Sequence, residues 1–343
     1  MVPFNFVLSS QTSKEIRDSL NLMAESFGPV DVSFREFYEW QYLRNPFGKG
    51  IVLLAYDGDA PIGQFAGIPC IYQFRGRIIR TLLTLNLAVS PKYRRKGIML
   101  KLLEQIRKED LLTPFSIGVP NCQSLKGHLT NGFIPLQMNL LVRPIRLSHY
   151  FTGFGRLVFR PLDIIWKKSP KEEVEDYQFP FDRRFDEWAT KRDKNKIQQV
   201  RNAVYLNWRY ASNPRRNYKI FVTREKTDKM DGYIIVRITE FATKSVGVIM
   251  DLMFTNETKA RQLVLKSLEY FWKNNVSIAI SACFPDDIEM NLLRKFGFLS
   301  LPQRFHPHPM ILGLKVLDNS DPIACELIDV NKWIFRFGDY DIF

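Results

Sequence analysis

The stretch VSPKYRRKGIML, residues 89–100, decides which folds this chain can adopt. An apolar, strand-like run ends at Val89, and an amphipathic, helix-like run begins near Gly97. The first N–H groups of a helix lack partners within it and the helix dipole adds positive potential, so a helix start attracts anions. Gly97 permits a ligand to approach closely, and three cations lie in the loop: Arg94, Arg95 and Lys96. The stretch predicts a phosphate-binding loop or, alternatively, a solvated basic turn before a helix.

The sequence on both sides of this loop alternates strand-like and helix-like segments. Residues 51–89 contain apolar runs separated by Gly-containing turns, which is typical of antiparallel strands. Residues 97–112 repeat apolar side chains every four positions, at Ile98, Leu102 and Ile106. A second apolar strand signal follows at residues 115–119. Strands mixed with crossing helices predict an α/β fold built in layers.

Two parts of the chain share a motif. WQYLRNP at residues 40–46 and WRYASNP at residues 208–214 have the same W-x-Y-x-x-N-P frame at an offset of 168. The apolar runs TLNLAV at residues 84–89 and IMDLMF at residues 249–254 match at an offset of 165. Nearly constant offsets predict an internal duplication. The expected parts are an N-terminal domain at residues 1–145, a linker at 146–177, and a C-terminal domain with the tail at 178–343.

The basic loop and its surroundings resemble the Gcn5-related N-acetyltransferase (GNAT) superfamily. The family's acetyl-CoA signature, Arg/Gln-x-x-Gly-x-Gly/Ala after a V-x-P strand end, is matched by residues 94–99 after Val89-Ser90-Pro91. The family's Asn after the next strand and its closing Gly-Phe are matched by Asn121 and Gly132-Phe133. The resemblance covers residues 50–140 and, more weakly, the second half. It implies tandem GNAT folds, each a mixed central sheet with splayed central strands flanked by helices.

The resemblance implies acetyl-CoA as the co-substrate and no metal. Backbone amides of the loop would hold the pyrophosphate, the edge of the preceding strand would pair with the pantetheine amides, and polar residues after the next strand would lie beside the pantetheine arm. The loop residues are Arg94, Arg95, Lys96, Gly97, Ile98 and Met99, the strand residues are Leu87, Ala88 and Val89, and the polar residues are Asn121 and Ser124.

Two positions depart from the family pattern, one in the loop and one near the expected leaving group. Met99 replaces the second small residue of the signature. His128 stands where the family usually has a Tyr that protonates the leaving thiolate. A histidine can do this work near neutral pH, although it can equally be a capping or core residue.

The predicted central strand TLLTLNLAV, residues 81–89, contains no carboxylate, whereas many family members have a Glu base there. Thr84 and Asn86 face one side of this strand and could hold a water molecule or the acetyl carbonyl. The tail carboxylates Asp339 and Asp341 therefore become candidate bases, unless they are surface residues in a turn. A Gly-Asp-x-Asp tail resembles the ends of some tandem acetyltransferases of bacterial surface-polysaccharide gene clusters.

The second copy lacks the signature. Its loop reads TNETKARQ, residues 255–262, which has no Gly and places Glu257 where it would repel a phosphate. We therefore expect the second half to wall the substrate cleft and to bind no CoA.

Charge and composition limit the partners. The net charge of +13 favours anionic ligands, but the basic residues are dispersed and no nucleic-acid recognition motif is present. Four scattered cysteines, the lack of a signal-peptide core and the lack of a long apolar run predict a cytoplasmic protein without a transmembrane segment. The basic, aromatic stretch at residues 143–168 is either a structured linker or a surface for membranes or substrate phosphates.

Acetyl-CoA-dependent N-acetyl transfer to a small amine is the leading functional hypothesis, with a nucleotide-linked amino sugar as the preferred acceptor. One alternative is aminoacyl or other acyl transfer in cell-envelope biosynthesis, against which the intact loop argues. The other alternative is a non-catalytic CoA-binding scaffold.

Overall fold

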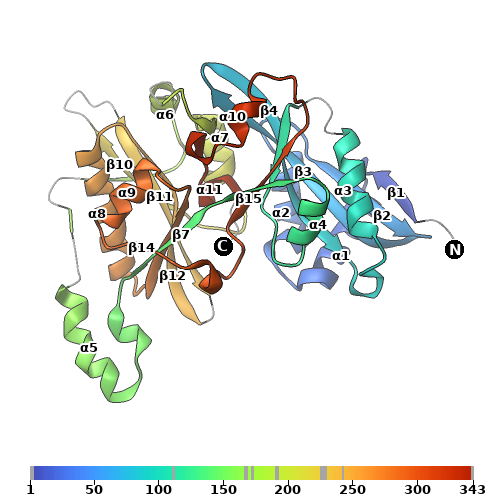
Figure 1. The fold of residues 1–343 in the computed structure, drawn as a ribbon. Coiled ribbons are helices and arrows are strands. Elements are labelled where there is room, and N and C mark those ends of the chain that lie inside the picture. The colour runs from blue at the N-terminus through green and yellow to red at the C-terminus, as the bar shows by residue number, and fades with distance from the viewer. Residues whose placement is uncertain are drawn as a thin grey trace.

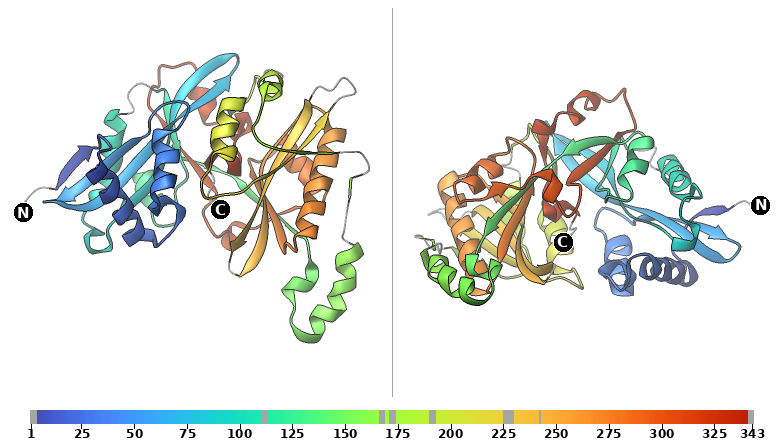
Figure 2. Two further views of the ribbon diagram at one scale, coloured as in Figure 1. Left: turned by 180° about the vertical axis from the view of Figure 1, so that it is seen from behind. Right: turned by 60° about the horizontal axis from the view of Figure 1, so that its bottom comes forward.

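The computed structural model describes residues 4–109, 113–165, 169–170, 174–189, 193–224, 230–241 and 243–340. Two halves lie side by side, each built around a sheet (Figures 1 and 2). The last segment of the chain, drawn in red, lies between them. The mixed α/β architecture with two helix-flanked sheets confirms the predicted fold class.

The first sheet holds the basic loop. Its strands follow the order β1 (Asn5–Leu8), β2 (Ile51–Asp57), β3 (Ala60–Phe74), β4 (Arg77–Val89), β5 (Phe115–Gly118), β15 (Ile311–Val316) and β6 (Ile134–Gln137), with β9 (Ile197–Gln199) beside β3 and β16 (Trp333–Ile334) beside β9. Neighbours from β1 to β4 are antiparallel, and β4 and β5 are parallel. Helices α1 (Ser13–Phe27) and α3 (Ile98–Glu109) pack on this sheet, and α4 (Leu125–Thr130) follows β5.

The second sheet repeats this arrangement. Its order is β14 (Leu299–Ser300), β7 (Asn139–Pro144), β13 (Ile278–Cys283), β12 (Lys244–Phe254), β11 (Met230–Phe241), β10 (Lys219–Arg224) and β8 (Glu175–Tyr177). As in the first sheet, four antiparallel strands lead to a parallel pair. Here the four are β8, β10, β11 and β12, and the parallel pair is β12 and β13. Helices α8 (Glu257–Lys273) and α9 (Ile288–Arg294) lie against it, at the left of Figure 1.

The two sheets exchange strands across the predicted domain boundary. Strand β7 pairs with β13 in the second sheet, although it precedes residue 145. Strand β15, from the last part of the chain, is inserted between β5 and β6 of the first sheet. The sequence boundaries at residues 145 and 178 therefore do not separate the sheets, because backbone pairing of β7 and β15 ties each half to the other.

The repeated W-x-Y motif forms a contact between the halves. Each copy contains a π-helical turn, Glu39–Leu43 after α2 (Arg35–Tyr38) and Asn207–Ala211 after α7 (Ala203–Leu206). The Trp40 indole N–H donates to the Trp208 carbonyl at 2.7 Å, and the Trp208 indole N–H donates to the Trp40 carbonyl at 3.0 Å. Their rings stack with centroids 5.0 Å apart. Both side chains are buried in a hydrophobic cluster that extends through both halves.

The remaining α-helices of the described residues are α5 (Gly153–Ile165), α6 (Arg183–Ala189), α10 (Ala324–Leu327) and α11 (Phe337–Tyr340). Among the described residues, every helix is too short or too polar to cross a bilayer. That same part of the chain contains no group of three His, Cys, Asp or Glu residues arranged to hold a metal ion.

Candidate functional site

The central strands of the first sheet separate next to the basic loop. Strands β4 and β5 pair only as far as Thr84 and Gly118, and β4 then continues to Val89. The Thr84 hydroxyl donates to the Ile117 carbonyl at 2.9 Å. Beyond this contact the β5-facing edge of β4 has no β5 partner, as the predicted splay requires. An open strand edge presents backbone N–H and C=O groups to a ligand.

A β-bulge interrupts β4 where the strands diverge. Ala66 of β3 pairs with Leu85 and Gln64 pairs with Ala88, so two residues of β4, Asn86 and Leu87, oppose one residue of β3. Asn86 has a φ of +52°, a left-handed conformation that few non-Gly residues adopt. A bulge leaves its extra residue out of the ladder and commonly lies beside an active site.

The side chain of Asn86 contacts the repeated motif. Its amide nitrogen donates to Gln41 Oε1 at 2.7 Å and to the Tyr42 hydroxyl at 2.6 Å. Gln41 and Tyr42 lie in the π-helical turn and are buried. Burial raises the pKa of Tyr42 well above its ordinary value, so its hydroxyl stays protonated. The Asn86 side-chain amide is therefore anchored by neutral hydrogen bonds to the π-helical turn.

The loop after β4 has the local geometry of an anion site. Arg95 has a φ of +65° and Gly97 a φ of +77°, and α3 begins at Ile98. A Cβ added to Gly97 would meet no atom within 4 Å, so the residue is needed for its backbone conformation and leaves open space beside it. The loop therefore presents the start of α3 to an open region.

That open region is a cavity of about 480 Å³. It is lined by Ser26, Phe27, Leu87, Ala88, Val89, Tyr93, Arg94, Arg95, Gly97, Ile98, Met99, Leu100, Asn121, Gln123 and Ser124. Every residue predicted to bind the cofactor is among them except Lys96, whose ammonium lies 4.6 Å from the centre of the Tyr93 ring. The C-terminal end of α1, which contributes Ser26 and Phe27, carried no sequence signal for this role.

Residues after β5 close one side of the cavity. Asn121 Oδ1 accepts the backbone N–H groups of Gln123 at 3.0 Å and Ser124 at 2.9 Å, so it builds the turn into α4. Met99 packs on Gly127, where an added Cβ would lie 2.2 Å from the Met99 methyl group. The bulk of Met99 at the signature position is thus matched by a glycine in α4.

His128 does not line the cavity. Its ring is buried edge-on against Phe133, with centroids 5.0 Å apart, and its Nδ1 donates to the Ser124 carbonyl at 2.9 Å when that nitrogen carries the proton. Burial lowers the pKa of His128 despite this hydrogen bond. The structure therefore favours the core position that the sequence left open.

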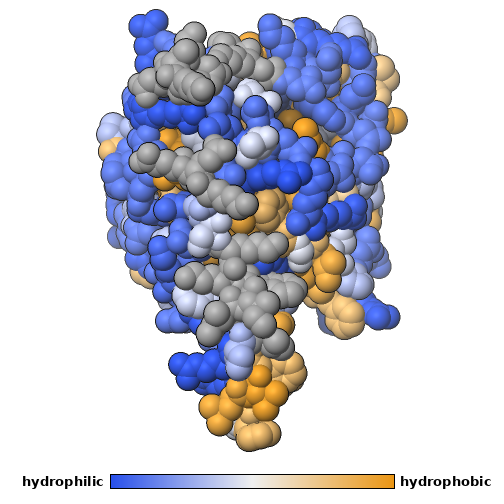
Figure 3. Space-filling model, turned by 90° about the vertical axis from the view of Figure 1, so that its left-hand side faces the viewer, coloured by the Kyte–Doolittle hydropathy of each residue, from blue (hydrophilic) through white to orange (hydrophobic). Residues whose placement is uncertain are grey.

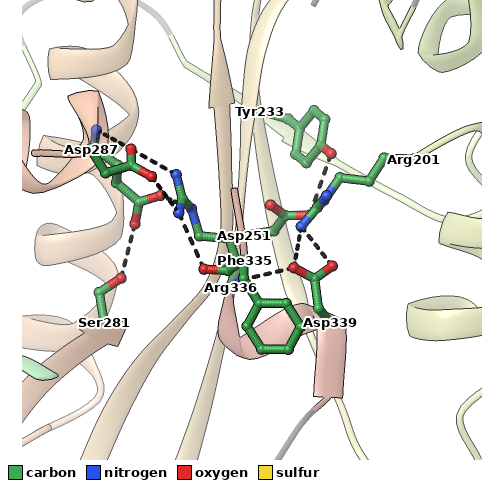
Figure 4. Close-up of polar contacts among 9 residues, drawn as sticks. Arg201, Tyr233, Asp251, Ser281, Asp287, Phe335, Arg336 and Asp339 are labelled. Carbon is green, nitrogen blue, oxygen red and sulfur yellow. Dashed lines mark hydrogen bonds and ion pairs between the residues drawn. The ribbon is translucent and has the colours of Figure 1, made fainter. Parts of the chain in front are cut away.

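Asp339 is also absent from the cavity. Its carboxylate accepts two bonds from Arg201 Nη2, at 2.7 and 2.8 Å, and Arg201 Nε donates to Asp251 at 2.6 Å. All three side chains are buried, and Figure 4 shows Asp251 and Asp339 directed at the Arg201 guanidinium. Because Asp339 is buried against Arg201 and does not line the cavity, it is not assigned as a base. The other candidate, Asp341, lies outside the described residues.

The matching region of the second half is built differently. Asn256 Oδ1 accepts the N–H groups of Thr258 at 2.8 Å and Lys259 at 3.3 Å, so the start of α8 is capped by its own chain. Glu257 pairs with Lys295 at 2.7 Å. A separate cavity of about 560 Å³ lies beside Leu252, Met253 and Phe254. Arg336 lines it and is held by Asp287 at 2.8 Å (Figure 4).

Part of the chain is similar in sequence to a known protein family. Residues 8–120 match the family model described as acetyltransferase (GNAT) domain. No curated protein matches the chain significantly.

Solved structures share the fold over 92% of this chain. A GCN5-related N-acetyltransferase from Anabaena variabilis has a TM-score of 0.60 at 15% identity over 73% of its own chain. A probable N-acyltransferase from Enterococcus faecalis has 0.61 at 12% over 73%. The Saccharomyces cerevisiae N-myristoyltransferase with bound myristoyl-CoA has 0.59 at 12% over 82%. Residues 8–120 are therefore similar to an acetyltransferase (GNAT) domain, and the solved structures show that nearly the whole chain shares their fold.

Proposed function

We propose that the chain transfers the acetyl group of acetyl-CoA to a small amine. The observation that carries the proposal is the cavity bounded by the open edge of β4, the start of α3 and the bulge at Asn86. The pyrophosphate would lie against the N–H groups of the loop, where the helix dipole and Arg94 and Arg95 favour negative charge. The pantetheine amides would pair with the edge of residues 87–89.

The reaction then needs no covalent enzyme intermediate. The amine lone pair attacks the thioester carbonyl carbon, the C–S bond breaks, and CoA leaves as a thiolate. The backbone N–H that the bulge removes from the ladder is a donor available to the developing oxyanion. The described residues that line the cavity include neither a carboxylate nor a histidine. We therefore assign rate enhancement to proximity and oxyanion stabilisation, with the amine proton leaving through water.

For the acceptor we propose a nucleotide-linked amino sugar. The support is a net charge of +13, which favours a diphosphate-bearing substrate, together with the resemblance of the tail to tandem enzymes of polysaccharide gene clusters.

We also propose that the halves descend from one duplicated fold and that only the first binds CoA. The repeated strand order, the two π-helical turns and the reciprocal Trp40–Trp208 bonds support the duplication. The capped start of α8 and the Glu257–Lys295 pair support a single CoA site.

Calorimetric titration with acetyl-CoA tests the cofactor assignment. Gly97→Glu should abolish binding, because it adds bulk and negative charge beside the pyrophosphate. Gly76→Glu is the matched control, since Gly76 has a φ of +79° and equally open surroundings in the β3–β4 turn. Two CoA molecules per chain, or equal affinity in both variants, would contradict the assignment. Thiol release with a panel of amino sugar nucleotides and simple amines then tests the acceptor.

A further inference from the structure

Helix α5 and the short helical turn at Leu147–Tyr150 form a projection from the second half. In Figure 1 the projection, in green, extends downward from the body, and the left view of Figure 2 shows the same. It begins directly after β7 and lies away from the cavity of the first half.

The outward side of α5 is apolar. Phe154 is 81% exposed, Leu157 64% and Val158 52%, and these positions are spaced as i, i+3 and i+4. Such a stripe normally faces the protein core. Here it faces solvent, and hydrophobic residues gather at the lower end of the space-filling view in Figure 3.

The inward side of α5 packs against residues of the same projection. Phe159 stacks on Phe151 with ring centroids 3.9 Å apart. Asp163 is buried and accepts the backbone N–H of Ser148 at 3.1 Å and its hydroxyl at 2.6 Å. These contacts hold the helix on the projection, so the outward apolar stripe is not needed for packing.

The charges around the stripe are positive. Arg156 and Arg160 are exposed on α5, and the ammonium of Lys244 lies 5.5 Å from the centre of the Tyr150 ring at the base of the projection. Within residues 145–165 the only acid is Asp163, which is buried. Apolar and aromatic side chains flanked by arginines, with the acid turned inward, match the surface of an anionic bilayer.

We propose that α5 inserts its apolar stripe into the interface of a membrane that contains anionic phospholipid. Phe154, Leu157 and Val158 enter the boundary between headgroups and acyl chains. Arg156 and Arg160 extend along the helix and place their guanidinium groups among the lipid phosphates. The projection thereby holds the protein at the bilayer surface without spanning it, and it leaves the opposite half free.

Vesicle co-sedimentation with the full chain tests the proposal. The wild type should bind vesicles of phosphatidylcholine mixed with phosphatidylglycerol, bind pure phosphatidylcholine weakly, and dissociate as salt is raised. Val158→Asp should lower the bound fraction by about tenfold or more. Val204→Asp is the matched control, because Val204 is exposed to a similar extent, 58%, on α7. It should bind as the wild type does.

Two results would overturn the proposal. One is a wild type that stays in the supernatant with phosphatidylglycerol vesicles. The other is equal binding by Val158→Asp and Val204→Asp. If light scattering instead shows a dimer that only Val158→Asp disrupts, the stripe serves contact between protein copies. Replacing Arg156 and Arg160 by Gln should remove the preference for phosphatidylglycerol, and an unchanged preference would refute the role of the arginines.

Discussion

The reciprocal tryptophan contact makes a quantitative prediction about how the halves are joined. Each indole of the pair donates to the backbone carbonyl of the other residue, and both side chains are buried. Trp40→Phe keeps an aromatic ring in place and removes only one of the two donors. Trp208→Phe makes the same change from the opposite side.

The expected cost follows from the carbonyl that each substitution leaves behind. A buried acceptor without its donor costs about 1–3 kcal/mol. Because the two bonds are of similar length, 2.7 and 3.0 Å, the two variants should lose similar free energies of unfolding. The stacked rings should add a coupling of about 1 kcal/mol in the double variant.

Urea unfolding followed by far-ultraviolet circular dichroism measures all three costs without relying on tryptophan emission. The reasoning fails if either single variant loses less than about 0.5 kcal/mol, or if one loses several times more than the other. Such a result would mean that only one copy of the motif supports the contact.

Two further predictions concern buried ionisable groups. Arg201→Met leaves the carboxylates of Asp251 and Asp339 buried without their cation, so the free energy of unfolding should fall by about 3–5 kcal/mol at pH 8. Burial raises the pKa of Asp339, so its protonation on acidification should make the loss smaller at pH 5. Urea unfolding at both pH values checks this, and equal losses would refute it. Burial lowers the pKa of His128, so below about pH 6.5 the unfolded chain binds a proton at this residue that the folded chain does not bind. The free energy of unfolding of the wild type should therefore fall as the pH drops through that range. His128→Phe should lack this part of the pH dependence. Since His128 does not line the cavity, His128→Phe should also keep kcat within about tenfold, and a loss of ~10²–10⁴ would restore it as the leaving-group acid.

The basic loop could be predicted from the sequence because its requirements are local. Neighbouring residues predict three features of the loop: the end of a strand, a glycine at position 97 that can adopt a positive φ, and an amphipathic run that begins there. The same holds for the edge residues Leu87 to Val89. Their assignment to CoA remains a proposal, although the structure gathers them around one cavity.

The strand exchange could not be predicted in the same way. Strands β7 and β15 are both short apolar runs, and either would fit an interior place in either sheet. Which sheet each joins depends on contacts far away in the sequence. The bulge at Asn86 could not be predicted for a similar reason, because the residues that Asn86 contacts, Gln41 and Tyr42, are distant in sequence. The repeated W-x-Y frame was the one sequence feature that marked the turn containing Gln41 and Tyr42 as structurally important.

Asp339 shows the limit of arguing from a missing residue. The central strand lacks a carboxylate and the tail contains two, so the sequence favours the tail as the source of a base. The tail sequence does not indicate that Asp339 is buried and paired with Arg201, which lies more than a hundred residues earlier. Burial and pairing of a charge are tertiary properties, and they decide whether a carboxylate can act as a base.

The insertion of β15 between β5 and β6 has a consequence for how the protein is made. On the ribosome, β5 emerges about 200 residues before the strand that covers its edge. Until then the growing chain carries a hydrophobic sheet whose edge has unpaired backbone donors and acceptors, and such an edge can pair with strands of other chains. Translation must pass Val316 before the sheet beside the cavity is whole. Expressing residues 8–120 alone should therefore yield aggregates, even though this segment contains the recognisable acetyltransferase motif.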